Sequence, residues 1–224
     1  IQSMKSYIST WNESKIFPVF LTFLVIILFL ILPYSQNRPF IQGLVSLFLA
    51  ANLVLGVYSI KTNTTVRYLA IFLAIVVSTL EILNVNIEIS NLIIFASVCW
   101  ILIIGLLLYV FIIKVFETNS DSIHRIQGGI ASYLLIGLLF AFVFYLIYNL
   151  SPHSFSINDS LSSSEMIFYD FIYYSYVNLC TVGFGDITPV VPLSQSTSIL
   201  EAIIGVLFPT VLIGYLISDA TSKK

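Results

Sequence analysis

The sequence has few charged residues and few histidines, and each shortage excludes a class of protein. Only 9% of its 224 residues are charged, 58% are hydrophobic, and the formal net charge is -2. Such a composition is not that of a soluble domain, and the small net charge gives no reason to expect a nucleic-acid partner. The two histidines lie far apart, and the chain has no metal-ligand cluster, nucleophile elbow or phosphate-binding loop. We therefore expect neither an enzyme nor a bound cofactor.

Cysteine is equally scarce. The two cysteines, Cys99 and Cys180, both lie in apolar surroundings. This excludes a disulfide framework and predicts two buried thiols that contribute to packing.

Long apolar runs are abundant, and the mean hydropathy is +1.02. A helix needs roughly 20 apolar residues, or slightly fewer, to cross the bilayer core. Six runs meet this length, so we predict an all-α membrane protein with six spanning helices in contact with the lipid bilayer. The predicted helices cover residues 16–32, 40–60, 66–82, 91–113, 130–150 and 197–218.

Residues 151–196, between the fifth and sixth runs, contain a shorter apolar stretch over residues 166–180. This stretch is too short to cross a membrane, so it predicts a re-entrant half-helix. Ser162 and Glu165 have capping-box spacing at its start, and Asp170 also lies in its amino-terminal half, where the helix dipole favours acid. The negative carboxyl end then points into the membrane, where it would stabilise a cation.

The segment that follows, residues 181–186, reads TVGFGD. Gly183 and Gly185 are free to take left-handed backbone angles, and they alternate with Val182 and Phe184 so that successive carbonyls can face one way. This segment resembles the selectivity filter of potassium channels, TVGYGD or commonly the same motif with Phe. The resemblance covers residues 130–218 as outer helix, pore helix, filter and inner helix. The chain as a whole is similar to the bacterial six-transmembrane type with one pore loop.

The resemblance implies an ion site made of backbone carbonyls. The carbonyls of Thr181, Val182, Gly183 and Phe184 would coordinate K⁺ as the permeant ligand, and the Thr181 hydroxyl would complete the innermost site. Gly185 and Asp186 complete the motif. Because each chain has only one such motif, four copies must surround the axis, which implies a homotetramer.

Four residues are expected to support the filter. Tyr173 and Tyr174 occupy the aromatic positions of the pore helix, either with other hydrogen-bond partners or packed against Phe184. Val177 stands where some bacterial channels have a carboxylate that pairs with the filter aspartate, so Asp186 lacks that partner. Glu201, an acid in the outer half of the inner helix, is expected behind the filter, protonated or hydrogen-bonded to pore-helix hydroxyls.

The inner helix contains residues that can bend it. Gly205 lies at the family's separation for a hinge glycine, and Pro209 can produce a fixed kink. Close packing between helices is the alternative for each, since small residues are common at membrane helix contacts. The sequence therefore does not decide whether Gly205 and Pro209 act in gating or in helix packing.

Residues 16–116 would form a four-helix peripheral domain similar to a voltage sensor, preceded by an interfacial helix over residues 1–15. Residues 117–129 would link this domain to the pore domain, residues 130–224. Voltage sensing takes about three to four gating charges per subunit, whereas the predicted fourth helix, residues 91–113, has no charged residue. Glu81 has no evident basic partner and is expected to be a hydrogen-bonded structural acid. Strong voltage gating is therefore not expected.

The basic residues predict the orientation. With the amino terminus inside, eight of them lie on the inner side and only Arg38 lies outside, so both termini are expected to be cytoplasmic in a multi-pass cell-membrane protein. The inner set comprises Lys5, Lys15, Lys61, Arg67, Lys114, Arg125, Lys223 and Lys224. The predicted function is a potassium-selective channel. The alternatives are a nonselective cation channel and a non-conducting channel subunit or membrane scaffold.

Overall fold

The computed structural model describes residues 18–35, 39–58, 64–87, 90–116, 122–157 and 167–222. Within these ranges the protein is mostly helical. The first helix is α-helical over residues 18–26 and continues as a π-helix (Ile27–Ile31) and a 3-10 helix (Leu32–Ser35). It is followed by α2 (Pro39–Tyr58), α3 (Thr64–Ile87), α4 (Ser90–Val115), α5 (Ser122–Leu150), β1 (Phe155–Ile157), α6 (Phe168–Leu179), β2 (Ile187–Pro189) and α7 (Pro192–Ser222).

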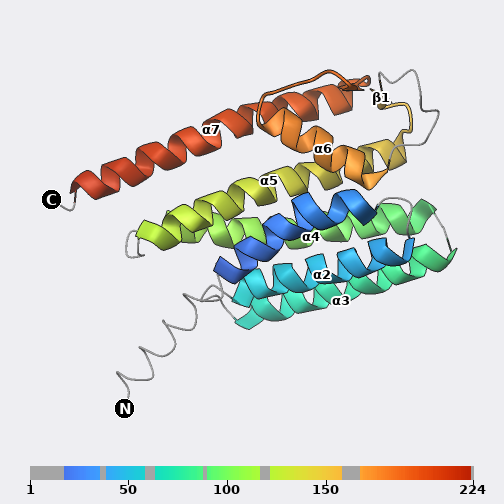
Figure 1. Cartoon of the computed structure of the whole chain (residues 1–224), viewed down its shortest axis with the longest axis horizontal. Coiled ribbons are helices and arrows are strands. Elements are labelled where there is room, and N and C mark those ends of the chain that lie inside the picture. The colour runs from blue at the N-terminus through green and yellow to red at the C-terminus, as the bar shows by residue number, and fades with distance from the viewer. Residues whose placement is uncertain are drawn as a thin grey trace, which may run out of the picture.

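The helices form two groups that meet along α4 and α5. The first helix, α2, α3 and α4 lie on one side of the molecule, and α5, α6 and α7 lie on the other (Figure 1). The buried core of the first group contains Phe20, Leu53, Trp100 and Leu107, and it continues without a break into α5. Gly56 permits this packing, because a Cβ there would lie only 2.8 Å from the Phe20 ring.

Four helices within the described ranges are long and apolar enough to cross a membrane: Thr64–Glu81, Leu92–Val115, Arg125–Leu150 and Pro192–Asp219. Two further apolar helices, Pro18–Tyr34 and Gly43–Tyr58, are shorter. The prediction of an all-helical membrane protein therefore agrees with the four long helices. The count of six spans stays a prediction.

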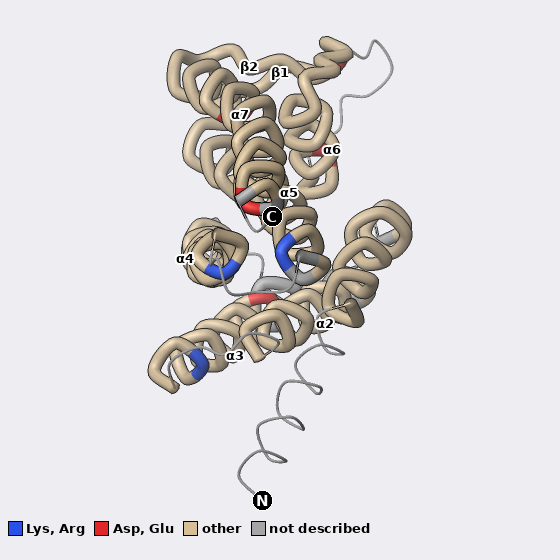
Figure 2. The backbone as a smooth tube through the Cα atoms, turned by 90° about the vertical axis from the view of Figure 1, so that its left-hand side faces the viewer, with Lys and Arg blue, Asp and Glu red and all other residues tan. Residues whose placement is uncertain are grey.

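The described basic residues gather at one end of the molecule. Arg67 lies near the start of α3, Lys114 near the end of α4 and Arg125 near the start of α5. The carboxyl end of α7 lies at the same end (Figure 1), and Figure 2 views the molecule from there. The predicted interfacial helix over residues 1–15 lies outside the described residues, as do Ser162 and Glu165.

The structure differs from the sequence prediction at two elements. First, α5 begins at Ser122, inside the predicted linker over residues 117–129. Gly128 and Gly129 belong to this helix, and they allow neighbouring helices to approach closely: a Cβ at Gly128 would lie 2.8 Å from the Val115 side chain.

Second, two short strands accompany the predicted helices. β1 pairs with β2 in antiparallel register, with Phe155 opposite Pro189. The bond from the Val190 N–H to the Ser154 carbonyl, at 2.9 Å, extends this connection. Phe155 and Ile187 are buried below the strands. The strands thus tie the segment after α5 to the segment that precedes α7.

Candidate ion-binding site

Helix α6 and residues 181–186 form a re-entrant unit. The helix enters from the end of the molecule where β1 and β2 lie and stops part of the way along α5 and α7, and the chain then returns to that end (Figure 1). We call residues 181–186 the TVGFGD segment. All six of its residues are exposed in the single chain.

The backbone of the TVGFGD segment alternates in hand. Thr181, Gly183 and Gly185 have positive φ angles of 58°, 58° and 79°, and the residues between them do not. The two glycines take the angles that the sequence indicated. Thr181 was not anticipated, because a β-branched residue in the left-handed region is strained and has to be held there by its surroundings.

Hydrogen bonds from the backbone hold the start of the segment against α6. The Thr181 N–H donates to the Asn178 carbonyl, and the Val182 N–H donates to the Val177 carbonyl, both at 2.9 Å. The last carbonyls of a helix have no partner within the helix, so these amides satisfy them. The amides at the start of the segment are therefore turned toward α6, and the carbonyls of these residues are left for other partners. The negative end of the α6 dipole lies beside them.

Asp186 has hydrogen-bond partners that the sequence did not identify. The Tyr173 hydroxyl donates to Asp186 Oδ2 at 2.6 Å, and the Ile187 N–H donates to Oδ1 at 3.0 Å. The Tyr173 and Phe184 rings are nearly parallel, with centroids 6.5 Å apart and 5° between the planes. The hydrogen bond to Asp186, together with desolvation, raises the pKa of Tyr173 to about 12. Tyr173 is therefore a protonated donor at neutral pH.

Tyr174 points elsewhere. Its hydroxyl shares a hydrogen bond with Ser198 Oγ of α7 at 2.7 Å. Its ring packs against Phe144 and Phe155, with centroids 5.0 and 5.4 Å away. Of the two tyrosines predicted beside the segment, Tyr173 contacts it and Tyr174 ties α6 to α7.

Glu201 of α7 lies against α6, with none of its surface exposed. Its Oε2 accepts a hydrogen bond from Asn178 Nδ2 at 2.7 Å, and its Oε1 contacts the Ser175 hydroxyl. That hydroxyl also lies 2.7 Å from the Gly137 carbonyl. One hydroxyl proton serves one acceptor, so both contacts form together when Glu201 carries a proton and donates it to Ser175.

Two participants were missed by sequence reasoning. Asn178 donates to Glu201 and to the Ser198 carbonyl, the latter at 2.8 Å. The Tyr133 hydroxyl of α5 donates to the Leu179 carbonyl at the end of α6, at 3.2 Å. The spacing of Ser175 and Asn178 on one face of an apolar half-helix was a usable signal. Nothing in the sequence near Tyr133 indicates its contact.

Gly205 is a point of close approach. A Cβ there would lie 2.0 Å from the Leu179 carbonyl oxygen, so α7 crosses the end of α6 at a residue without a side chain. This favours the packing role that the sequence allowed. Pro209 lies inside α7, which continues on both sides of it. Hinge motion at Gly205 or Pro209 stays a prediction.

An apolar cavity of about 270 Å³ lies between the first helix and α6. Val177, Val182 and Cys180 line it, together with Tyr173 and Phe29. The prediction of two buried thiols is half right: Cys99 is buried, whereas Cys180 is exposed because it follows the last turn of α6. Val177 faces this cavity beside the back of the segment.

Backbone oxygens are the cation ligands that this site offers. In the part of the chain that the structure describes, no three His, Cys, Asp or Glu side chains gather as a metal site. The carbonyls of the TVGFGD segment, beside the negative end of α6, remain as hard oxygen acceptors. Such a site can bind a cation without changing it chemically.

Comparison with known proteins agrees with this chemistry. Residues 132–222 match a protein-family model described as "Ion channel". The match begins within α5 and continues through α6 and the TVGFGD segment to the end of α7. No curated protein and no solved structure matches the chain. The match supports an ion-channel family for this part of the protein and, with it, passive ion conduction through a membrane.

Proposed function

We propose that the protein is a potassium-selective channel. The observation that carries this proposal is the backbone of the TVGFGD segment: its residues alternate in backbone hand, and the amides at its start bond to the end of α6. K⁺ loses its water to the carbonyls of residues 181–184 and moves down its gradient by displacement between adjacent sites. Asp186, held by Tyr173, fixes the outer end of the segment.

The proposed channel is a homotetramer. One chain supplies one TVGFGD segment, and a ring of carbonyls around an ion needs four. The exposure of the whole segment in a single chain supports this assembly, as do the exposed apolar side chains along α7, including Ile199, Ile203 and Val206. These surfaces face neighbouring subunits and the ion path.

Residues 130–224 form the pore domain of this channel, and residues 16–116 form its peripheral domain. Between Ser90 and Ile113, α4 has no charged residue, so the peripheral domain is not an arginine-based voltage sensor. The gathering of Arg67, Lys114 and Arg125 at one end supports a cytoplasmic location for that end and for both termini. The membrane is the cell membrane.

Flux into liposomes tests the proposal. Purified protein is reconstituted, and uptake of K⁺ is compared with uptake of Na⁺. Gly183→Ala removes the freedom to hold a φ of 58° although nothing lies within 4 Å of the added Cβ, so the change acts through the backbone. Gly105→Ala is the matched control, because its Cβ also has open space but its φ is not positive.

We expect selective K⁺ uptake by the wild type and by Gly105→Ala, and uptake reduced about tenfold or more in Gly183→Ala, since strain of this kind costs about 1–3 kcal/mol. Equal Na⁺ uptake by the wild type would identify a nonselective cation channel. A folded protein that takes up neither ion would identify a non-conducting subunit or scaffold.

A further inference from the structure

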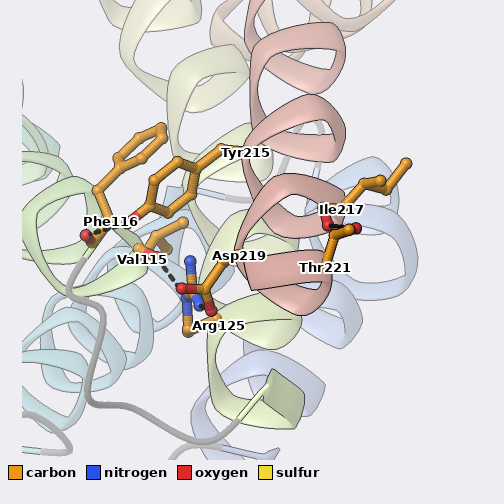
Figure 3. Close-up of polar contacts among 7 residues, drawn as sticks. All are labelled: Val115, Phe116, Arg125, Tyr215, Ile217, Asp219 and Thr221. Atoms are coloured by element: carbon orange, nitrogen blue, oxygen red, sulfur yellow. Dashed lines mark hydrogen bonds and ion pairs between the residues drawn. The ribbon is translucent and has the colours of Figure 1, made fainter. Parts of the chain in front are cut away.

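The end of α4, the start of α5 and the end of α7 meet around one buried arginine (Figure 3). Only 2% of the Arg125 side chain is exposed. Its Nε donates to the Val115 carbonyl at 2.9 Å, and its Nη1 donates to Asp219 Oδ2 at 2.6 Å. One side chain of α5 thus holds both α4 and α7.

Tyr215 of α7 adds two contacts to this cluster. Its ring centre lies 4.9 Å from Arg125 Cζ, a cation–π distance. Its hydroxyl donates to the Phe116 carbonyl at 2.7 Å. Arg125 and Tyr215 therefore cap the last carbonyls of α4, which have no partner within that helix, and the positive charge complements the α4 dipole.

The fit of the helices strengthens this arrangement. A Cβ at Gly129 would lie 2.3 Å from Leu212 Cδ2, so α7 touches α5 where α5 has no side chain. Leu212 itself is 9% exposed. A displacement of the whole end of α7 away from α5 would open both this contact and the ion pair.

Partial release is also unfavourable on electrostatic grounds. Separating Asp219 from Arg125 leaves a buried guanidinium without its counter-charge, which is strongly destabilising. The end of α7 is therefore either bound or free. Two residues beyond Asp219 on α7, Thr221 is exposed, and its hydroxyl donates to the Ile217 carbonyl of its own helix at 2.9 Å.

We propose that Arg125, Tyr215 and Asp219 form a latch that holds the inner end of α7 away from the pore axis and thereby favours the conducting state. This rests on the proposed function, in which α7 is the inner helix of a tetramer. The TVGFGD segments surround the axis, so α5 and α4 lie farther from it than α7. Four latched ends stay apart, and four released ends can close the path.

Single-channel recording tests the gating effect. Asp219→Asn removes the ion pair, and Tyr215→Phe removes the bond to Phe116 while it keeps the ring over Arg125. We expect each to lower the open probability, by roughly fivefold or more, with unitary current and K⁺ selectivity unchanged. Thr221→Val is the control and leaves the open probability as it is. Unchanged or raised open probability in both latch variants would overturn the proposal.

A charge-reversal double variant distinguishes loss of the ion pair from a folding defect. Arg125→Asp and Asp219→Arg each break the pair, whereas the double variant restores opposite charges at the two positions. We expect the double variant to open more often than either single variant. A double variant that elutes as folded protein and opens no more often than the single variants would contradict the latch.

Distance measurement separates the latch from the proposed function. Ile123, 69% exposed at the start of α5, and Thr221 are replaced by cysteine for nitroxide labels, in a background of Cys99→Ala and Cys180→Ser. Labelled chains are diluted with unlabelled ones. We expect Asp219→Asn to lengthen and broaden the distance distribution within one chain. An unchanged distribution overturns the latch, whereas absence of K⁺ flux in the wild type overturns the channel and the gating role but not the contact between the helices.

Discussion

The two contacts of the Ser175 hydroxyl require a proton on Glu201, and this protonation can be tested. Glutamine can donate to Ser175 Oγ and accept from Asn178 Nδ2 as a protonated glutamate does. We therefore expect Glu201→Gln to unfold within about 1 kcal/mol of the wild type. Glu201→Ala removes one hydrogen bond from each of two groups, Ser175 Oγ and Asn178 Nδ2, and should lose about 2 kcal/mol or more.

Thermal unfolding in lipid nanodiscs, followed between acidic and alkaline buffers, measures both variants. Ser175→Ala in the Glu201→Gln background is the control, because it removes the shared partner. Equal destabilisation by Gln and Ala would show that Glu201 is ionised and accepts from both neighbours.

The sequence predicted the backbone angles of the two glycines better than the contacts of the side chains around them. Gly183 and Gly185 were expected in the left-handed region because glycine alone reaches it without strain. The angle at Thr181 is imposed by bonds to the end of α6, which no local pattern encodes. Likewise, Tyr173 is thirteen residues from Asp186 and Arg125 is ninety-four from Asp219, so their pairing depends on how helices pack.

At the level of helices, a continuous set of contacts leads from α3 to the start of α6. Trp100 Nε1 donates to Glu81 Oε1 at 3.0 Å. The Trp100 ring stacks on Phe142 of α5, with centroids 5.1 Å apart, and Phe142 packs against Phe168, the first residue of α6, at 4.3 Å. Glu81, for which the sequence indicated no partner, thus positions the buried indole of Trp100 between the two helix groups.

Removing the acceptor should loosen this contact. Trp100 is 1% exposed, so Glu81→Leu leaves a buried N–H unpaired, and we expect a loss of about 1–3 kcal/mol in the free energy of unfolding. Glu81→Gln keeps an acceptor and should stay close to the wild type. Leu83→Ala, on an exposed part of α3, is the control. Trp100 emission in a Trp11→Phe background, recorded during unfolding, measures all three.

The same outcome for Glu81→Leu and Glu81→Gln would mean that the hydrogen bond contributes nothing to the free energy of unfolding.

The hydropathy pattern predicted the helices of this region but neither the strands nor the start of α5. β1 and β2 are three residues each and depend on the pairing of Phe155 with Pro189. α5 begins at Ser122, and its close contacts with α4 and α7 at Gly128 and Gly129 depend on how the helices pack.

At the scale of the whole molecule, the described basic residues lie at one end, where an electric field across the membrane does little work on them. Moving one elementary charge through the field is worth about 2.3 kcal/mol per 100 mV. α4 offers only Lys114, in its last turn, and Arg125 and Asp219 are paired with each other at the same end. A movement of these helices therefore carries almost no net charge through the field.

We accordingly expect the open probability to change less than about tenfold over 100 mV of either sign, whereas about three to four charges in each of four subunits would make it change steeply. Recording purified protein in a planar bilayer measures this directly. Asp219→Asn should move the whole curve to lower open probability without making it steeper, because the ion pair lies at the edge of the field. Steep activation by voltage would show that charge elsewhere in the chain crosses the field and would overturn the assignment of the peripheral domain.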